Sequence, residues 1–150
     1  MAKFHFKLLP LQRYREQYRD VCRQGLARVL AEDAELLQRR EELTAAREGV
    51  MAELLQLQNE NRLNVDQTVA RRFHAAQLTT QIRQLDMQRE EVAVRMHVCR
   101  QALAKADQEV KVLEQLAEKQ ELEFRKVLEA RESREREEVW QAGQLRVDWQ

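Results

Sequence analysis

The sequence of 150 residues carries 26 basic and 26 acidic residues, with 35% of all positions charged, 5% aromatic, three glycines and one proline. This composition is typical of long helices with solvated faces rather than of a domain with a thick core. The balanced, interspersed charges provide no basic patch for nucleic acid, and no apolar run approaches the ~20 residues needed to cross a bilayer.

The first part of the chain carries a helical pattern that begins at a proline. Pro10 suits the first turn of a helix, because the N–H that proline lacks would have no partner there. A seven-residue repeat then runs to position 57, which predicts a helix over about 10–60 with one stripe facing a partner helix. The apolar positions of this repeat, called here the 22–57 seam, are Cys22, Val29, Leu36, Leu43, Val50 and Leu57. Polar residues interrupt the stripe at Asp33, Arg40 and Arg47.

The stretch 59–67 ends this pattern with three asparagines and an aspartate. Asn64 suits the N-cap of a second helix, and Gln67, three residues later, completes a capping box. The sequence therefore predicts a turn at about 61–64 and a second helix that begins near Val65.

The second helix carries the more regular repeat. Apolar residues recur there in alternating steps of four and three, interrupted only at Arg89 and Gln120, and no Gly or Pro lies between positions 59 and 142. Such a repeat keeps one stripe towards a partner helix, so we expect one helix over about 65–140. Its apolar positions, the 78–127 seam, are Leu78, Ile82, Leu85, Val92, Met96, Cys99, Leu103, Ala106, Val110, Leu113, Ala117, Phe124 and Val127.

Two long helices joined by a short turn are expected to run antiparallel. The predicted fold class is therefore all-α, a long two-helix antiparallel coiled-coil hairpin that forms a single domain over 1–150. With the fold-back point near Arg62, residue i lies opposite about residue 124 − i. The first helix then has no residues left to lie opposite the second helix beyond about Gln120, and about 30 Å of the second helix continues past that point. Either the segment 4–9 or a different protein covers Phe124 and Val127.

The C-terminal part of the chain loses the apolar repeat. Residues 129–139 are almost entirely alternating charges, which hold a helix only weakly, and Gly143 follows. We therefore expect the helix to end near Trp140 and a frayed tail at 141–150. Two interpretations of the tryptophans Trp140 and Trp149 stay open, either a frayed end that carries them incidentally or a tail that docks on a partner.

The start of the second helix departs from the heptad pattern. Extended backwards, the 78–127 seam falls on Ala75 and then on the polar residues Arg71, Thr68 and Asn64, whereas the apolar residues there are Val65, Val69 and Phe73. In one interpretation the seam stutters and these apolar residues pack against the segment 54–57. In the other, Phe73 is exposed near the turn and anchors a partner. The residues of that predicted surface are Val69, Phe73, Gln77 and Thr80.

No pattern of a catalytic or metal site stands out. His5, His74 and His97 lack the spacing of metal ligands, and a two-helix hairpin offers no concave, partly dry site for catalysis. Cys22 and Cys99 are too few for a disulfide framework and are expected to be free thiols in the reducing cytoplasm. The sequence therefore predicts a cytoplasmic, non-enzymatic protein without a cofactor or a metal.

The opening of the chain resembles that of a known family. Residues 4–15 read FHFKLLPLQRYR, with Phe4, Phe6, Leu8 and Leu11 followed by Arg13 and Arg15. This start resembles that of the FliJ family of flagellar export proteins. The length, the charge-rich two-helix pattern, the polar turn near residue 60, the aromatic residue nine positions into the second helix and the basic-acidic stretch 131–138 are similar as well.

The resemblance implies a fold and a set of partners. FliJ-like proteins form an antiparallel coiled coil similar to the central stalk of rotary ATPases. They bind the flagellar export ATPase hexamer, promote its assembly, link it to the cytoplasmic part of the membrane-embedded export gate and handle export chaperones. The resemblance thus implies flagellum biogenesis, type III protein export, motility and chemotaxis, with a location peripheral to the cytoplasmic face of the inner membrane at the flagellar base.

The same resemblance implies two groups of contact residues. The ends of the hairpin would meet the ATPase ring through Phe4, Phe6, Leu8, Phe124, Val127 and Trp140. The residues near the turn, Val69, Phe73, Gln77 and Thr80, would meet the export gate. Neither direct membrane insertion nor a nucleic-acid partner is expected. Two other functions stay open, the stalk of a virulence-type III secretion injectisome and a structural homodimeric coiled coil whose seams pair between chains.

Overall fold

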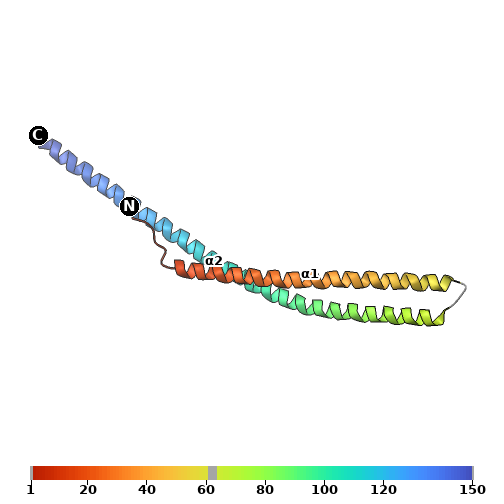
Figure 1. Ribbon diagram of the computed structural model, residues 1–150. Helices are drawn as coiled ribbons and strands as arrows, with labels where there is room; N and C mark the ends of the chain where they lie inside the picture. The colour runs from red at the N-terminus through yellow and green to blue at the C-terminus, as the bar shows by residue number, and fades with distance from the viewer. Residues whose placement is uncertain (1, 61–63, 150) are drawn as a thin grey trace. The chain divides into compact units, whose positions relative to one another are not determined.

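A computed structural model describes residues 2–60 and 64–149 of the chain (Figure 1). Its two helices are α1, Leu9–Asn59, and α2, Val65–Asp148. The predicted starts near positions 10 and 65 agree with these bounds to within one residue. Of the turn predicted at 61–64, positions 61–63 lie outside the described residues. The all-α, two-helix fold class is confirmed.

The C-terminal end of α2 differs from the prediction. The helix continues through Gly143 to Asp148 instead of ending near Trp140, and the expected fraying of 141–148 is wrong for this structure. Gly143 costs a helix about 1 kcal/mol relative to alanine, and nothing approaches its backbone. The neighbours Gln141, Ala142, Gln144 and Leu145 are good helix formers, so one unfavourable residue does not end the helix.

The chain divides into two compact units. One, called here the central unit, comprises Val21–Ala104, and the other, the terminal unit, comprises Met1–Asp20 together with Lys105–Gln150. Cross-helix ion pairs occur within each unit, and they show the direction of the helices. They are Asp33–Arg89, Glu32–Arg95, Arg40–Asp86 and Glu53–Arg71 in the central unit, and Arg15–Glu109 and Arg19–Asp107 in the terminal unit.

The residue numbers in each of these pairs add up to between 122 and 127. A nearly constant total means that α1 ascends as α2 descends, so within each unit the helices are antiparallel. The values also agree with the predicted register, in which residue i lies opposite about residue 124 − i.

The core of the central unit is formed by the predicted seams. Within this unit α1 and α2 lie side by side over 21–59 and 65–104 (Figure 1). Val50 packs with Ala75 and Leu78, and Leu43 and Leu54 border this cluster. Burial continues along the same stripe at Val29, Ile82, Leu85 and Val92. Each buried side chain of this size contributes about 1.5–3 kcal/mol of hydrophobic stabilisation.

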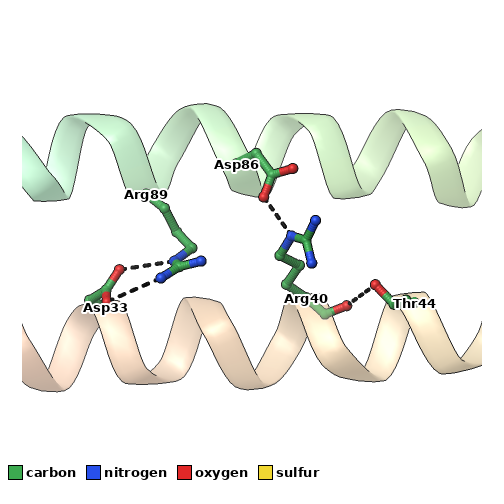
Figure 2. Close-up of polar contacts among 5 residues, drawn as sticks. All are labelled: Asp33, Arg40, Thr44, Asp86 and Arg89. Atoms are coloured by element: carbon green, nitrogen blue, oxygen red, sulfur yellow. Dashed lines mark hydrogen bonds and ion pairs between the residues drawn. The ribbon is translucent and has the colours of Figure 1, made fainter.

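The two interruptions Asp33 and Arg40 of the 22–57 seam pair across the helices, Asp33 with the interruption Arg89 and Arg40 with Asp86 beside the seam position Leu85 (Figure 2). Arg89 donates hydrogen bonds to both carboxylate oxygens of Asp33, at 3.0 and 3.5 Å, and Arg40 donates to Asp86 at 2.6 Å. The hydrogen bond to Asp33 raises the pKa of Arg89 above its usual value. Paired charges at or beside seam positions help to specify the register of a coiled coil, because a shift of one helix separates the opposite charges.

The thiols of the central unit take part in the same stripe. Cys22 and Cys99 are half-buried and free. Both are seam positions, where a free cysteine behaves as a small apolar side chain.

Candidate functional site

The N-terminal phenylalanines pack on α2 within the terminal unit. The backbone N–H of Leu9 donates to the carbonyl of Phe6 at 3.2 Å, which turns the segment back at the start of α1. The Phe6 side chain is buried. The rings of Phe4 and Phe124 lie 5.7 Å apart between centroids and are tilted by 49°, a favourable geometry for an aromatic pair. The segment before α1 therefore covers the 78–127 seam at Phe124, one of the two alternatives left open by the sequence.

The six residues predicted to meet an ATPase ring separate into two groups. Phe4, Phe6 and Phe124 are engaged with one another or buried by the chain itself. By contrast, Leu8, Val127 and Trp140 have 39%, 68% and 64% of their surface exposed. Only this second group presents its side chains to a partner without a change in the terminal unit.

Beyond Phe124 the helix α2 has almost no packing partner. Every residue from 129 to 149 is exposed, including Val139, Trp140, Leu145 and Trp149. Val139 and Trp140 line a shallow hollow with Glu132, Glu135 and Arg136. An exposed tryptophan of this kind is a side chain from which binding energy to a protein partner is expected.

The N-cap predicted at Asn64 is present at the start of α2. The backbone N–H of Gln67 donates to the Asn64 side-chain oxygen at 3.4 Å, and the Thr68 hydroxyl donates to the Asn64 carbonyl at 3.1 Å. The cap fixes where the helix begins.

The seam of α2 extends backwards from Leu78 without a stutter. Ala75 is buried, and Arg71, one turn earlier, donates to Glu53 on α1 at 2.7 Å. Val65, Val69 and Phe73 are therefore turned away from α1, with 66%, 60% and 65% of their surface exposed. The interpretation in which they pack against the segment 54–57 is wrong, because the Arg71–Glu53 pair and Ala75 occupy that side of α2.

The residues predicted to meet the export gate share one exposed face. Val69, Phe73, Gln77 and Thr80 follow each other at steps of three or four and are all exposed. Phe73, Gln77 and Thr80 line a shallow hollow with Ala76, Gln81 and Gln84. An exposed ring beside amide and hydroxyl groups offers both an apolar anchor and hydrogen-bonding groups to a partner.

Sequence reasoning missed a second apolar surface beside this face. Met51 and Leu55 are 49% and 62% exposed on α1, and they line a groove with Leu54, Gln58, Arg72, Ala75, Ala76 and Thr79. The available signal was that Met51 follows the seam position Val50 and that Leu55 follows Leu54, which borders the core cluster of Val50. Ala76 lines this groove as well as the hollow beside Phe73, so the two surfaces adjoin.

Two further observations on the described residues concern metals and membranes. Among them, no group of three or more His, Cys, Asp or Glu side chains is placed to hold a metal ion. No helix in the described part of the chain is long and apolar enough to span a bilayer. Comparisons of the chain with protein-family models, curated proteins and solved structures found no match.

Proposed function

We propose that the chain is a FliJ-like stalk component of a bacterial flagellar export apparatus, located peripherally at the cytoplasmic face of the inner membrane. In this role it binds the export ATPase hexamer, promotes its assembly, links it to the export gate and handles export chaperones. The observation that carries the proposal is the packing of the opening motif: Phe4 and Phe6 belong to the residues that resemble the family, and Phe4 contacts Phe124 on the second helix.

The arrangement supports different binding roles for different parts of the chain. The exposed group Leu8, Val127 and Trp140 supplies the contacts to the ring, while Phe4 and Phe6 hold the N-terminal segment on α2. The exposed face of Val69, Phe73, Gln77 and Thr80 supplies the contact to the gate. Large exposed apolar side chains on an otherwise charged helix are the residues from which binding energy is expected.

The ring contact is tested by mixing the protein with its cognate export ATPase. We expect the protein to increase both hexamer formation, measured by analytical ultracentrifugation, and ATP hydrolysis. The double variant Val127→Asp/Trp140→Ala should reduce both effects at least several-fold, whereas Phe73→Ala should not. If the unmodified protein changes neither assembly nor hydrolysis, the proposed role is wrong. A parallel mixture with an injectisome ATPase distinguishes the flagellar role from the virulence one.

The gate contact is tested with Phe73→Ala. Because the ring is exposed, its removal should change the free energy of unfolding by less than about 1 kcal/mol, compared with 3–5 kcal/mol for a buried phenylalanine. Binding to the cytoplasmic part of the export gate, measured by calorimetry, should weaken at least several-fold. Val94→Ala, which removes another exposed apolar side chain of α2, is the matched control and should leave binding unchanged.

A further inference from the structure

The face of α2 that carries the 78–127 seam continues into the part of the helix that nothing covers. Further steps of four and three from Val127 lead to positions 131, 134, 138, 141 and 145, and all of these are exposed in the terminal unit. The residues at these positions are Arg131, Arg134, Glu138, Gln141 and Leu145. Val127 and Leu145, at the two ends of this stripe, are 68% and 62% exposed. The stripe is therefore apolar at both ends and charged in the middle.

This stripe is complementary to itself when two copies run antiparallel. With a two-fold axis at position 136, Arg134 lies opposite Glu138 of the second copy, and Glu138 lies opposite Arg134 of the second copy. The same alignment places Val127 opposite Leu145 of the second copy, and it repeats this apolar layer at the other end. A two-fold axis makes every such contact occur twice.

Neighbouring alignments of the same stripe are unfavourable. A shift of the axis by half a heptad towards the N-terminus places Arg131 against Arg134, and the opposite shift places Arg134 against Leu145. In antiparallel coiled coils, charge pairs of this kind select the partner and the alignment. One alignment out of three neighbouring ones thus combines attraction in the middle with apolar layers at the ends.

We propose that the exposed C-terminal stripe of α2, residues 127–145, is a self-association surface through which two copies of the chain form an antiparallel, two-fold symmetric dimer. This inference goes beyond the proposed export role and does not depend on it. Because Val127 belongs to both surfaces, the dimer and the proposed ring contact exclude each other. At concentrations at which the dimer forms, this end would be covered until an ATPase ring competes for it.

The size and charge of the contact make the dimer reversible. A stripe of 19 residues extends over about 28 Å and is about 10 Å wide, which is smaller than the surface of permanent complexes. Glu135 and Glu137 also lie near their own counterparts beside the axis, and this repulsion weakens the dimer. We expect the dimer at concentrations of about 100 µM and the monomer after dilution to about 1 µM, as for other small interfaces.

The experiment is sedimentation equilibrium of the full chain over that concentration range. Arg134→Glu and Glu138→Arg each bring like charges together twice, so each variant alone should lose at least about tenfold in dimer affinity, as expected from two lost charge pairs. An equimolar mixture of the two variants restores opposite charges at both contacts and should form a heterodimer. Arg136→Glu is the matched control, because position 136 lies about 200° around the helix from position 134.

The outcomes separate the possible occupants of the stripe. Loss of the dimer in each single variant and its recovery in the mixture support the inference, with circular dichroism confirming equal helix content. A chain that stays monomeric at the highest concentration overturns it. A dimer that all three substitutions leave unchanged also overturns it, because the copies then associate through another surface, such as seams paired between chains. ATPase binding is measured separately, so failure here leaves the proposed export role standing.

Discussion

The central and terminal units close the same kind of apolar stripe by different means. In the central unit, Val21–Ala104, helix meets helix, and the polar interruptions on one helix find charged partners on the other. In the terminal unit, α1 gives way to a short non-helical segment whose phenylalanines cover the stripe as far as Phe124. After that point α2 continues alone. A heptad pattern thus indicates which face of a helix packs against a partner, while the length of the neighbouring element decides where on that face the partner is missing.

The largest expected difference in unfolding free energy is between a leucine buried between the helices of the central unit and an exposed leucine in the part of α2 beyond Phe124. Leu85→Ala in the central unit removes a side chain that is only 6% exposed and should lower the free energy of unfolding by about 2–4 kcal/mol. Leu145→Ala in the terminal unit, at 62% exposure, should change it by less than about 0.5 kcal/mol. Urea denaturation followed by circular dichroism measures both. Equal losses of unfolding free energy in the two variants would contradict the distinction between the part of α2 that packs on α1 and the part beyond Phe124.

The ion pair between Asp33 and Arg89 is expected to give the next largest effect. Asp33→Ala leaves the guanidinium of Arg89 without its partner at a seam position and should lower the free energy of unfolding by less than Leu85→Ala does, because water still reaches both side chains. A double-mutant cycle with Arg89→Ala should give a coupling energy that favours the pair. Glu53 and Arg71 provide the matched cycle near the turn, where the pair is more exposed and a smaller coupling is expected. A coupling near zero at Asp33–Arg89 would show that the pair does not hold the register.

The aromatic contact of the terminal unit should have a smaller and local effect. Phe4→Ala removes the pair with Phe124, which is expected to contribute about 0.5–1.5 kcal/mol. Amide hydrogen exchange should become faster in 9–20 and 105–124, while protection in 33–54 stays unchanged because those residues belong to the other unit. Phe124→Ala should produce the same pattern, and the two substitutions together should add little more. Uniformly faster exchange along the chain would contradict the separation into two units.

The pH dependence of the Glu32–Arg95 pair should give the smallest effect. The hydrogen bond from Arg95, helped by its charge, lowers the pKa of Glu32 below its ordinary value of 4.5. The carboxylate therefore stabilises the fold above that value, and the contribution is lost as the pH falls through the lowered pKa. The melting temperature of Glu32→Gln should lie below that of the unmodified protein at pH 7 and approach it near pH 3. Glu35→Gln, on the same helix, serves as the control, and a constant difference between pH 7 and pH 3 would contradict the prediction.

Most of the fold follows from the spacing of apolar residues. The predicted alignment of residue i with about 124 − i agrees with all six cross-helix ion pairs named above, because two continuous seams have few ways to match. The same spacing identified Asp33, Arg40 and Arg89 as interruptions. It did not show that Asp33 pairs with Arg89 and that Arg40 pairs with Asp86. Combining the alignment with the signs of the charges would have shown that Arg89 faces the stretch around Asp33.

The candidate surfaces were less predictable. The choice between a packed and an exposed Phe73 depends on whether the polar residues Arg71 and Thr68 continue the seam, and the apolar pattern alone favours neither. The structure decides it through the Arg71–Glu53 ion pair, a contact between residues 18 positions apart. The end of α2 was misjudged for the opposite reason, because one glycine and the loss of the seam received more weight than the helix-forming residues around them.

The alternating signs of the charged residues in Figure 2 have a mechanical consequence. On α1 an acid, Asp33, is followed by a base, Arg40, while on α2 the acid Asp86 is followed by the base Arg89. If α1 slid along α2 by one heptad in one direction, Arg40 would meet Arg89. A slide in the other direction would bring Asp33 against Asp86. Each displacement replaces attraction with repulsion at one of the two contacts, so these pairs oppose axial slippage in the central unit, and we expect a force applied to one helix to be passed on by bending or twisting the pair together.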